Sequence, residues 1–238
     1  MNEDKLYIDE KLGDEPFRFD DSVARVFPDM LRRSIPGYAA SIEAIGSLAA
    51  RYVEPGSNCY DLGCSLGAAS LAMRQGARTD DCRVIAVDNS PAMIERCAEI
   101  LGGDEHIELR LADVRDVAIE NASMVVMNYT LQFLDPADRD GIIARICRGL
   151  VPGGLLLLSE KVVDEDAHME ELLVDLHHEH KRRNDYSQLE IARKRAALED
   201  VLIPETVAAH KQRLELTGFA HSAVWLRYFN FVSVVAIK

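Results

Sequence analysis

The strongest limit on the fold of this chain is a regular alternation of short apolar segments with amphipathic ones. Buried strands are predicted in "NCYDLG", "CRVIAVD" (82–88), "HIELRLAD" (106–113), "ASMVVMNYTLQFL" (122–134, in part) and "LLLLSEKVV" (155–163). Helices are predicted between them, for example "AMIERCAEIL" after the N-capping Ser90-Pro91 pair and "DRDGIIARICRGL" (138–150). Five such β–α units predict a doubly wound, mostly parallel sheet.

The segments around this core predict one domain over residues 1–238 with two additions. Residues 1–40 are expected to form an irregular N-terminal lid segment, and residues 164–200 a helical insertion after strand five. The insertion is long enough for two helices and too charged to be buried core. Two apolar runs, "AHSAVWLRYF" and "NFVSVVAIK", follow each other so closely that they predict antiparallel strands. Further helices are expected at 41–53 and 204–219.

Composition narrows the classes of function. The net charge is −13, and a protein that binds DNA or tRNA directly usually has a basic face, so nucleic acid is not expected as the main partner. No apolar run approaches the roughly 20 residues of a membrane helix, and "MNEDKLYIDE" is too polar for a signal peptide. The five cysteines include no C-x-x-C pair, which suits reduced thiols. A cytoplasmic protein without a membrane anchor is therefore expected.

Polar residues follow the predicted strands at the point where each strand ends. Ligands of an open α/β sheet bind beyond the carboxyl ends of its strands, so these residues form the candidate site. Gly63 lets the loop after strand one turn tightly, and Gly67 lets the next helix pack closely. Ser65 stands where a dinucleotide site needs a bare backbone, which weakens a pyrophosphate interpretation. The strand-end residues are Asp61, Gly63, Cys64, Ser65, Asp88, Asn89, Asp113, Val114 and Asn128.

Two carboxylates suggest how a nucleoside would be held at these strand ends. Asp88, after strand two, can accept hydrogen bonds from both ribose hydroxyls, and Asp113, after strand three, can accept one from an adenine amino group. The alternative is that all these positions are ordinary turn residues, but four strand ends with fitting polar residues argue against it. NAD is the stronger rival, and it would require a second intact glycine and a catalytic Tyr/Lys or His set. No placed candidate for that set is found in the sequence.

The closing antiparallel strand resembles the ending of S-adenosylmethionine-dependent methyltransferase folds. Specific motifs extend the likeness: "FPDMLRRSIPGY", "YDLGCSLGAAS", "VIAVDNSPAMIERC", "DVRDVAIENASMVVMNYTLQFL", "PGGLLLLSEK", "LHHEHKRRNDYSQLEIARKR" and "FNFVSVVAIK". From about residue 17 onward the chain resembles the carboxy-S-adenosyl-L-methionine synthase family, a branch of the class I methyltransferases. The resemblance implies a Rossmann-like fold, with a mostly parallel seven-stranded sheet, an antiparallel last strand and a helical insertion after strand five.

The resemblance also implies an unusual reaction, in which S-adenosyl-L-methionine and prephenate give carboxy-S-adenosyl-L-methionine and phenylpyruvate. The product would pass to a tRNA carboxymethyltransferase that modifies wobble uridine. No metal is implied, but a homodimer is, in which the catalytic Arg195 of one chain meets the added carboxylate in the other chain's site. The implied cofactor-binding residues are Tyr38, Gly63, Cys64, Ser65, Asp88, Asn89, Asp113, Val114, Asn128 and Arg195. The chain departs from the family at its far N-terminus, near 100–106 and in "VVDEDAHME".

Other interpretations stay open from the residues alone. Arg195 could be a solvated helix charge, and an ordinary small-molecule methyltransferase or a non-catalytic cofactor-binding subunit would share the same cofactor site. His177 and His180 are spaced one turn apart, as a metal pair would be, but without a secure third ligand a polar helix face is favoured. The basic cluster from Lys181 to Arg195 could touch RNA, although a dicarboxylate such as prephenate explains it more simply.

Overall fold

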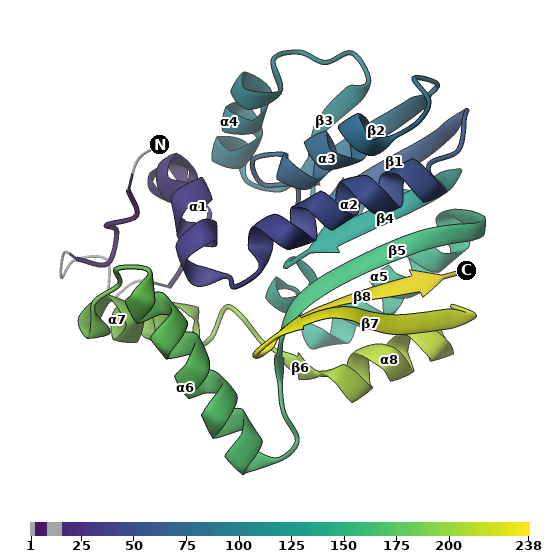
Figure 1. Ribbon diagram of the computed structural model, residues 1–238. Helices are drawn as coiled ribbons and strands as arrows, with labels where there is room; N and C mark the ends of the chain where they lie inside the picture. Colours follow the sequence, from purple (N-terminus) through teal and green to yellow (C-terminus); the bar gives the residue numbers. More distant parts are fainter. Residues whose placement is uncertain (1–2, 9–15) are drawn as a thin grey trace.

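The computed structural model describes residues 3–8 and 16–238, and Figure 1 shows a central sheet with helices packed on both faces. The main strands run in the order β3-β2-β1-β4-β5-β8-β7. Pairing is parallel from β3 to β5, whereas β8 is antiparallel to both of its neighbours, β5 and β7. This confirms a mostly parallel sheet with an antiparallel last strand. The strands are β1 (Ser57–Leu62), β2 (Cys82–Asp88), β3 (Ile107–Leu111), β4 (Ala122–Asn128), β5 (Leu150–Val163), β7 (His221–Tyr228) and β8 (Phe231–Ile237), with a short β6 (Glu205–Thr206) beside the end of β5.

The two faces of the sheet are built from alternate residues of the same strands. In β4, Met124 and Val126 face the helices α2 (Tyr38–Tyr52) and α3 (Ala68–Gly76), packing with Ile45 and Met73. Val125 and Met127 belong to the opposite core, which α5 (Pro136–Gly149) and α8 (Val207–Leu216) cover. Because both faces are buried, the strands are nearly continuous apolar runs, as parallel strands usually are. The carboxyl ends of β1 to β5 are thereby fixed along one edge.

The predicted insertion is present as two helices, α6 (Ala167–Arg183) and α7 (Gln188–Leu198). It is not the fully solvated segment that its charges predicted, since Lys181, Glu190 and Lys194 are all buried. Ser187 starts α7 with a capping box, in which its hydroxyl accepts from the Glu190 backbone N–H and the Glu190 carboxylate accepts from the Ser187 backbone N–H. The helices close one end of the cavity described below.

The expectation of irregular structure over residues 1–40 is wrong for α1 (Asp21–Ser34). Asp20 caps this helix by accepting from the Val23 backbone N–H, and Phe27 and Met30 are buried on its inner face. Pro28 lies inside the helix and removes one backbone donor, a loss that the cap and the buried face offset. The rest of the expected lid includes residues 1–2 and 9–15, which lie outside the described residues.

The prediction of five complete β–α units is also wrong at one place. β3 leads to β4 through residues 112–121 without a helix, whereas α4 (Pro91–Leu101) joins β2 to β3 as expected. After β4 the chain makes a 3₁₀-helix, Leu131–Phe133, before α5. Residues 112–114 and the segment 129–134 that contains this 3₁₀-helix therefore lie at the sheet's carboxyl edge, where they are available to line a site.

Candidate active site

A cavity of about 640 Å³ opens beyond the carboxyl ends of β1, β2, β4 and β5. Helices α1, α6 and α7 supply its other walls, so the cavity lies between the sheet edge and the insertion. The structure brings every site residue predicted from the sequence to this one cavity: Tyr38, Gly63, Cys64, Ser65, Asp88, Asn89, Asp113, Val114, Asn128 and Arg195. Their grouping is a property of the fold, and the roles assigned to them remain predictions.

The loop after β1 is held in shape by its own backbone. The N–H groups of Gly63 and Cys64 both donate to the Val87 carbonyl, at 2.8 and 2.9 Å. Gly63 has φ of 84°, and a Cβ there would lie 2.2 Å from Thr130 Oγ1, so only glycine fits. Ser65 adopts φ of 48° and donates its backbone N–H to the Asp88 carboxylate. The position that looked wrong for a phosphate loop therefore serves to tie β1 to β2.

Asp88 is the most constrained carboxylate of the cavity. One of its oxygens accepts from the Ser65 backbone N–H and the other from the Ser90 backbone N–H, both at 2.9 Å. Burial raises the pKa of Asp88 above the usual range in spite of these bonds. Each oxygen has a second lone pair, so the carboxylate can still accept hydrogen bonds from a ribose.

Asp113 lines the cavity as predicted and is also paired with a near neighbour in the chain. Its two oxygens accept from Nε and Nη2 of the Arg115 guanidinium, at 2.9 and 2.7 Å. This pair lowers the pKa of Asp113. The residue lines the cavity beside the buried Val114, but its oxygens are already engaged by an arginine. Recognition of an adenine amino group would therefore share this carboxylate with Arg115.

The loop after β4 presents an acceptor with no donor. Asn128 Oδ1 is buried and has no hydrogen-bond partner among the described residues. Next to it, the Tyr129 ring lies 6.5 Å from the Tyr38 ring and 5.9 Å from the Phe231 ring. Burial raises the pKa of both tyrosines, so their hydroxyls stay protonated. A buried unpaired amide oxygen beside aromatic rings fits a ligand that brings its own donor.

The wall formed by α6, α7 and the end of β5 is basic. The sequence predicts the basic cluster from Lys181 to Arg195, with a role only for Arg195, but it does not predict Lys161. Lys161, Lys181 and Lys194 also line the cavity. Burial lowers the pKa of Lys161, that of Lys181 to about 7 and that of Lys194 to about 8. Lys161 could have been predicted from its place near the carboxyl end of strand five, because the polar residues at the same end of the other strands form the candidate site.

The histidines of α6 do not form the metal pair considered from the sequence. His177 is buried, and its Nε2 bonds to the Ser34 carbonyl at 2.9 Å, while His180 lies against Asn184. Burial lowers the pKa of His177 well below its usual value, so the ring is neutral and donates. Within residues 3–8 and 16–238, no three side chains are grouped as metal ligands. None of the helices in those ranges combines the length and apolar character needed to cross a membrane.

Comparisons with known proteins agree with this architecture. Residues 60–154 match the family model described as a methyltransferase domain. Human N-acetylserotonin methyltransferase in complex with SAM superposes with a TM-score of 0.64 at 17% identity, over 92% of this chain and 55% of that one. An O-methyltransferase family protein from Burkholderia thailandensis gives 0.62 at 11% identity, over 92% of this chain and 59% of that one. These structures establish the fold.

Closer relatives are found among proteins of known activity. The carboxy-S-adenosyl-L-methionine synthase of Aliivibrio fischeri strain MJ11 is 54% identical over 232 residues, which is 96% of this chain and 95% of that protein. The enzyme of the same name from Trichlorobacter lovleyi is 55% identical over 226 residues, covering 93% of each. Identity at this level over nearly the whole length confirms the resemblance drawn from the motifs: the chain belongs to the carboxy-S-adenosyl-L-methionine synthase family.

Proposed function

We propose that this protein converts S-adenosyl-L-methionine and prephenate to carboxy-S-adenosyl-L-methionine and phenylpyruvate. One observation carries the proposal beyond family membership: the cavity at the sheet edge continues into a buried wall of cations. An ordinary methyl transfer has no need of several positive charges, since the sulfonium is itself cationic. A dicarboxylate substrate and a carboxylated product both need them.

S-adenosylmethionine is a substrate in this reaction, and Gly63, Ser65, Asp88 and Asn128 would hold it. Prephenate becomes aromatic when it loses carbon dioxide and hydroxide; the hydroxide takes a proton from the sulfonium methyl, and that carbon then bonds to the carbon dioxide. The products are phenylpyruvate, water and the carboxylated sulfonium, so atoms and charge balance. The protein's task is to hold both molecules together and exclude water, for which a cavity closed by α1, α6 and α7 is suited.

The reaction is tested by supplying both substrates with prephenate labelled in its ring carboxyl carbon. We expect phenylpyruvate to form faster than prephenate decays unaided, and the label to appear in a cofactor product heavier by one carbon dioxide. Mass spectrometry of that product is the measurement. Label absent from the cofactor, together with S-adenosylhomocysteine and a methylated acceptor, would instead identify an ordinary methyltransferase.

Arg195 is the residue proposed to meet the added carboxylate, because a guanidinium pairs with a carboxylate through two hydrogen bonds. It is exposed, lines the cavity and makes no hydrogen bond or salt bridge with the residues that the structure describes. We expect Arg195→Ala to bind S-adenosylmethionine normally and to lose about 1.5–3 kcal/mol of affinity for the carboxylated product. Calorimetric titration with each ligand measures this, and equal losses would leave Arg195 only a structural role.

A homodimer with shared sites remains part of the proposal. Met169 and Leu172 of α6 and Leu189 of α7 are exposed apolar side chains on the two helices that carry Lys181 and Arg195, and a subunit contact would use such side chains. The single chain already brings Arg195 to its own cavity, so an experiment has to distinguish whether Arg195 acts in its own chain's site or in the partner's site. Mixing Arg195→Ala subunits with Asp88→Ala subunits does so: activity returns only if Arg195 acts across the contact.

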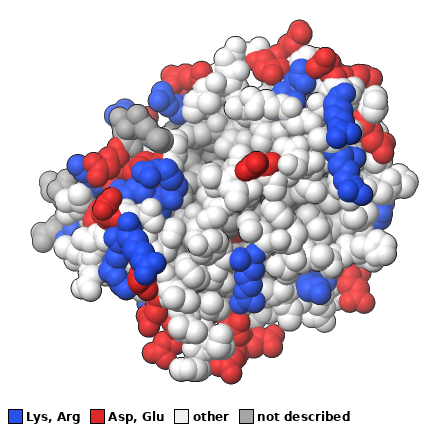
Figure 2. Space-filling model, viewed as in Figure 1, with Lys and Arg blue, Asp and Glu red and all other residues white. Residues whose placement is uncertain are grey.

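We propose that the product serves a separate tRNA carboxymethyltransferase in the cytoplasm, and that this chain does not itself bind tRNA. The described cysteines are all free thiols, which is consistent with a reducing compartment. On the face shown in Figure 2, acidic and basic side chains are interspersed around a broad uncharged surface. A continuous basic surface, which RNA binding would favour, is not seen on that face.

A further inference from the structure

The cations of the basic wall differ in whether the protein already neutralises them. Lys194 Nζ lies 3.5 Å from the Asp4 carboxylate and donates to Ser34 Oγ at 3.1 Å. Lys161 and Lys181 have no salt bridge or side-chain hydrogen bond to any residue in the ranges 3–8 and 16–238. Two ammonium groups of the wall are therefore left for a ligand, in addition to Arg195.

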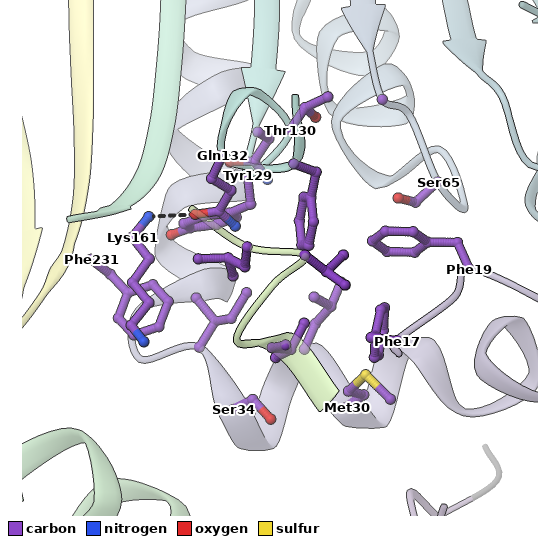
Figure 3. Close-up of a pocket in the computed structure, with 18 of the residues that line it drawn as sticks. Phe17, Phe19, Met30, Ser34, Ser65, Tyr129, Thr130, Gln132, Lys161 and Phe231 are labelled. Atoms are coloured by element: carbon purple, nitrogen blue, oxygen red, sulfur yellow. Dashed lines mark hydrogen bonds between the residues drawn. The ribbon is translucent and has the colours of Figure 1, made fainter. Parts of the chain in front are cut away.

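These two lysines are not ordinary surface charges. Lys181 is only 7% exposed. Lys161 comes directly after the buried residues of β5 and lines the cavity. Figure 3 shows Lys161 beside Phe231 at one side of the cavity, with Ser65 and Phe19 at the other. Burial and the neighbouring Lys194 and Lys161 lower the pKa of Lys181, and the attraction of Asp4, which no salt bridge joins to Lys181, offsets only part of this. A site that tolerates this in the free protein is built to receive an anion.

We propose that Lys161 and Lys181 bind the carboxylate of prephenate's pyruvyl side chain, the one that the reaction leaves unchanged. This inference rests on the proposed function and specifies which end of the substrate the lysines hold. The ring carboxylate is the less suitable partner, because it leaves as neutral carbon dioxide. An ammonium paired with it would stabilise the reactant anion and oppose its loss.

The other side of the cavity suits the ring carboxylate better. There Phe19 packs edge-on against Phe27 and Phe133, with ring centroids 6.1 and 5.2 Å away. These rings offer a leaving carboxylate neither counter-ion nor water, and desolvation promotes loss of carbon dioxide. With prephenate anchored by its side chain on the lysines, its ring would extend toward these phenylalanines and toward the loop that carries Ser65.

Phenylpyruvate is the decisive probe, because it keeps the side-chain carboxylate and lacks the ring carboxylate. We expect Lys161→Met and Lys181→Met each to raise the prephenate KM and the phenylpyruvate inhibition constant by the same factor, about tenfold or more, as for one lost charge-assisted hydrogen bond. Calorimetry should show unchanged affinity for S-adenosylmethionine. Lys181→Arg should restore part of the binding. Lys211→Met, which removes an exposed lysine of α8 away from the cavity, is the matched control.

Protonation gives an independent readout. The pKa of Lys181 is about 7 in the free protein, so its ammonium form is lost as pH rises above that value, and phenylpyruvate affinity should weaken over the same range. In Lys181→Arg the charge persists at that position, so the part of the weakening due to Lys181 should disappear and only the part due to Lys161 and Lys194 should remain. The charged or titratable groups that act on Lys181 are Asp4, Lys161, Lys194, Arg195 and the histidines His177, His178 and His180. Of these, only the lysines lose a positive charge above pH 7.

Three results would overturn the assignment. A raised prephenate KM with an unchanged phenylpyruvate inhibition constant would show that the lysines bind the ring carboxylate. An equal loss of affinity for S-adenosylmethionine would show that they bind the methionine end of that substrate. Unchanged constants in both variants would remove them from the site. A wild-type protein that makes no carboxylated cofactor would instead refute the proposed function, and phenylpyruvate titrations, which need no turnover, would still decide the role of the lysines.

Discussion

Replacing Gly63 with alanine is expected to remove measurable binding of S-adenosylmethionine and to destabilise the fold by about 2–5 kcal/mol. The new Cβ would lie 2.2 Å from Thr130 Oγ1 and 2.9 Å from Thr130 Cβ, so the loops after β1 and β4 would have to separate. The φ of 84° adds the strain of a left-handed alanine. Calorimetry with the cofactor and thermal unfolding measure the two effects.

Gly102→Ala is the matched control for this change. Gly102 also has positive φ, 62°, but a Cβ there meets nothing within 4 Å. Gly102→Ala should therefore lose only the folding stability that a left-handed alanine backbone costs, about 1–2 kcal/mol, and should bind the cofactor normally. If the two variants lose the same stability and both still bind, the close approach of Gly63 to Thr130 has no part in forming the site.

Arg139→Met should destabilise the protein by about 3–5 kcal/mol, the usual result of removing one partner from a buried ion pair. Arg139 is fully buried on α5 and donates to the carbonyls of Gln132, Leu134 and Ile203 and to the Glu205 carboxylate. It thus ties the loop after β4, which lines the cavity, to the segment before α8. Urea unfolding measures the loss, and prephenate turnover should fall with it because Gln132 and Leu134 would move.

Arg96→Met tests whether burial of the guanidinium is the reason for the large loss of stability expected for Arg139→Met. Arg96 is half-exposed, and among the described residues its salt-bridge partner is Glu99 on the next turn of α4, so its loss should cost less than about 1 kcal/mol. A similar small loss for Arg139→Met would mean that the buried guanidinium and its carbonyl partners do not hold the loop.

The strand ends could be predicted from the sequence because strands such as β2 and β4 are largely apolar runs that stop at a polar residue. That pattern alone predicts that Asp88, Asn128 and the Gly63 loop lie at the binding edge of the sheet. It could not separate Lys181 from the other charges of the basic cluster that ends at Arg195, because this segment has the charge density of a solvated helix. Only the packing of α6 against α1 and the sheet edge shows which of those charges turn inward.

Two features of the structure could not be predicted from the sequence for the same kind of reason. Residues 1–40 are expected to be irregular, yet helix capping by Asp20 and burial of Phe27 stabilise α1 in spite of the hydrogen bond lost at Pro28. Asp113 is predicted to accept from adenine because of its place after strand three, and that role stays a prediction; its pairing with Arg115, two residues on, could not be predicted from its place in the chain. In each case a contact made by tertiary structure or by a near neighbour decided between local alternatives.

The antiparallel position of β8 has a consequence for biosynthesis. β8 (Phe231–Ile237) lies between β5 and β7, although it is the last of the described strands to leave the ribosome. Until it emerges, β5 presents an unpaired apolar edge from Leu155 to Lys161 to the surrounding solution. A nascent chain stalled before residue 231 would thus expose an aggregation-prone edge right beside the half-formed cavity. Completion of the sheet, and of the wall that carries Lys161, has to wait for that final strand.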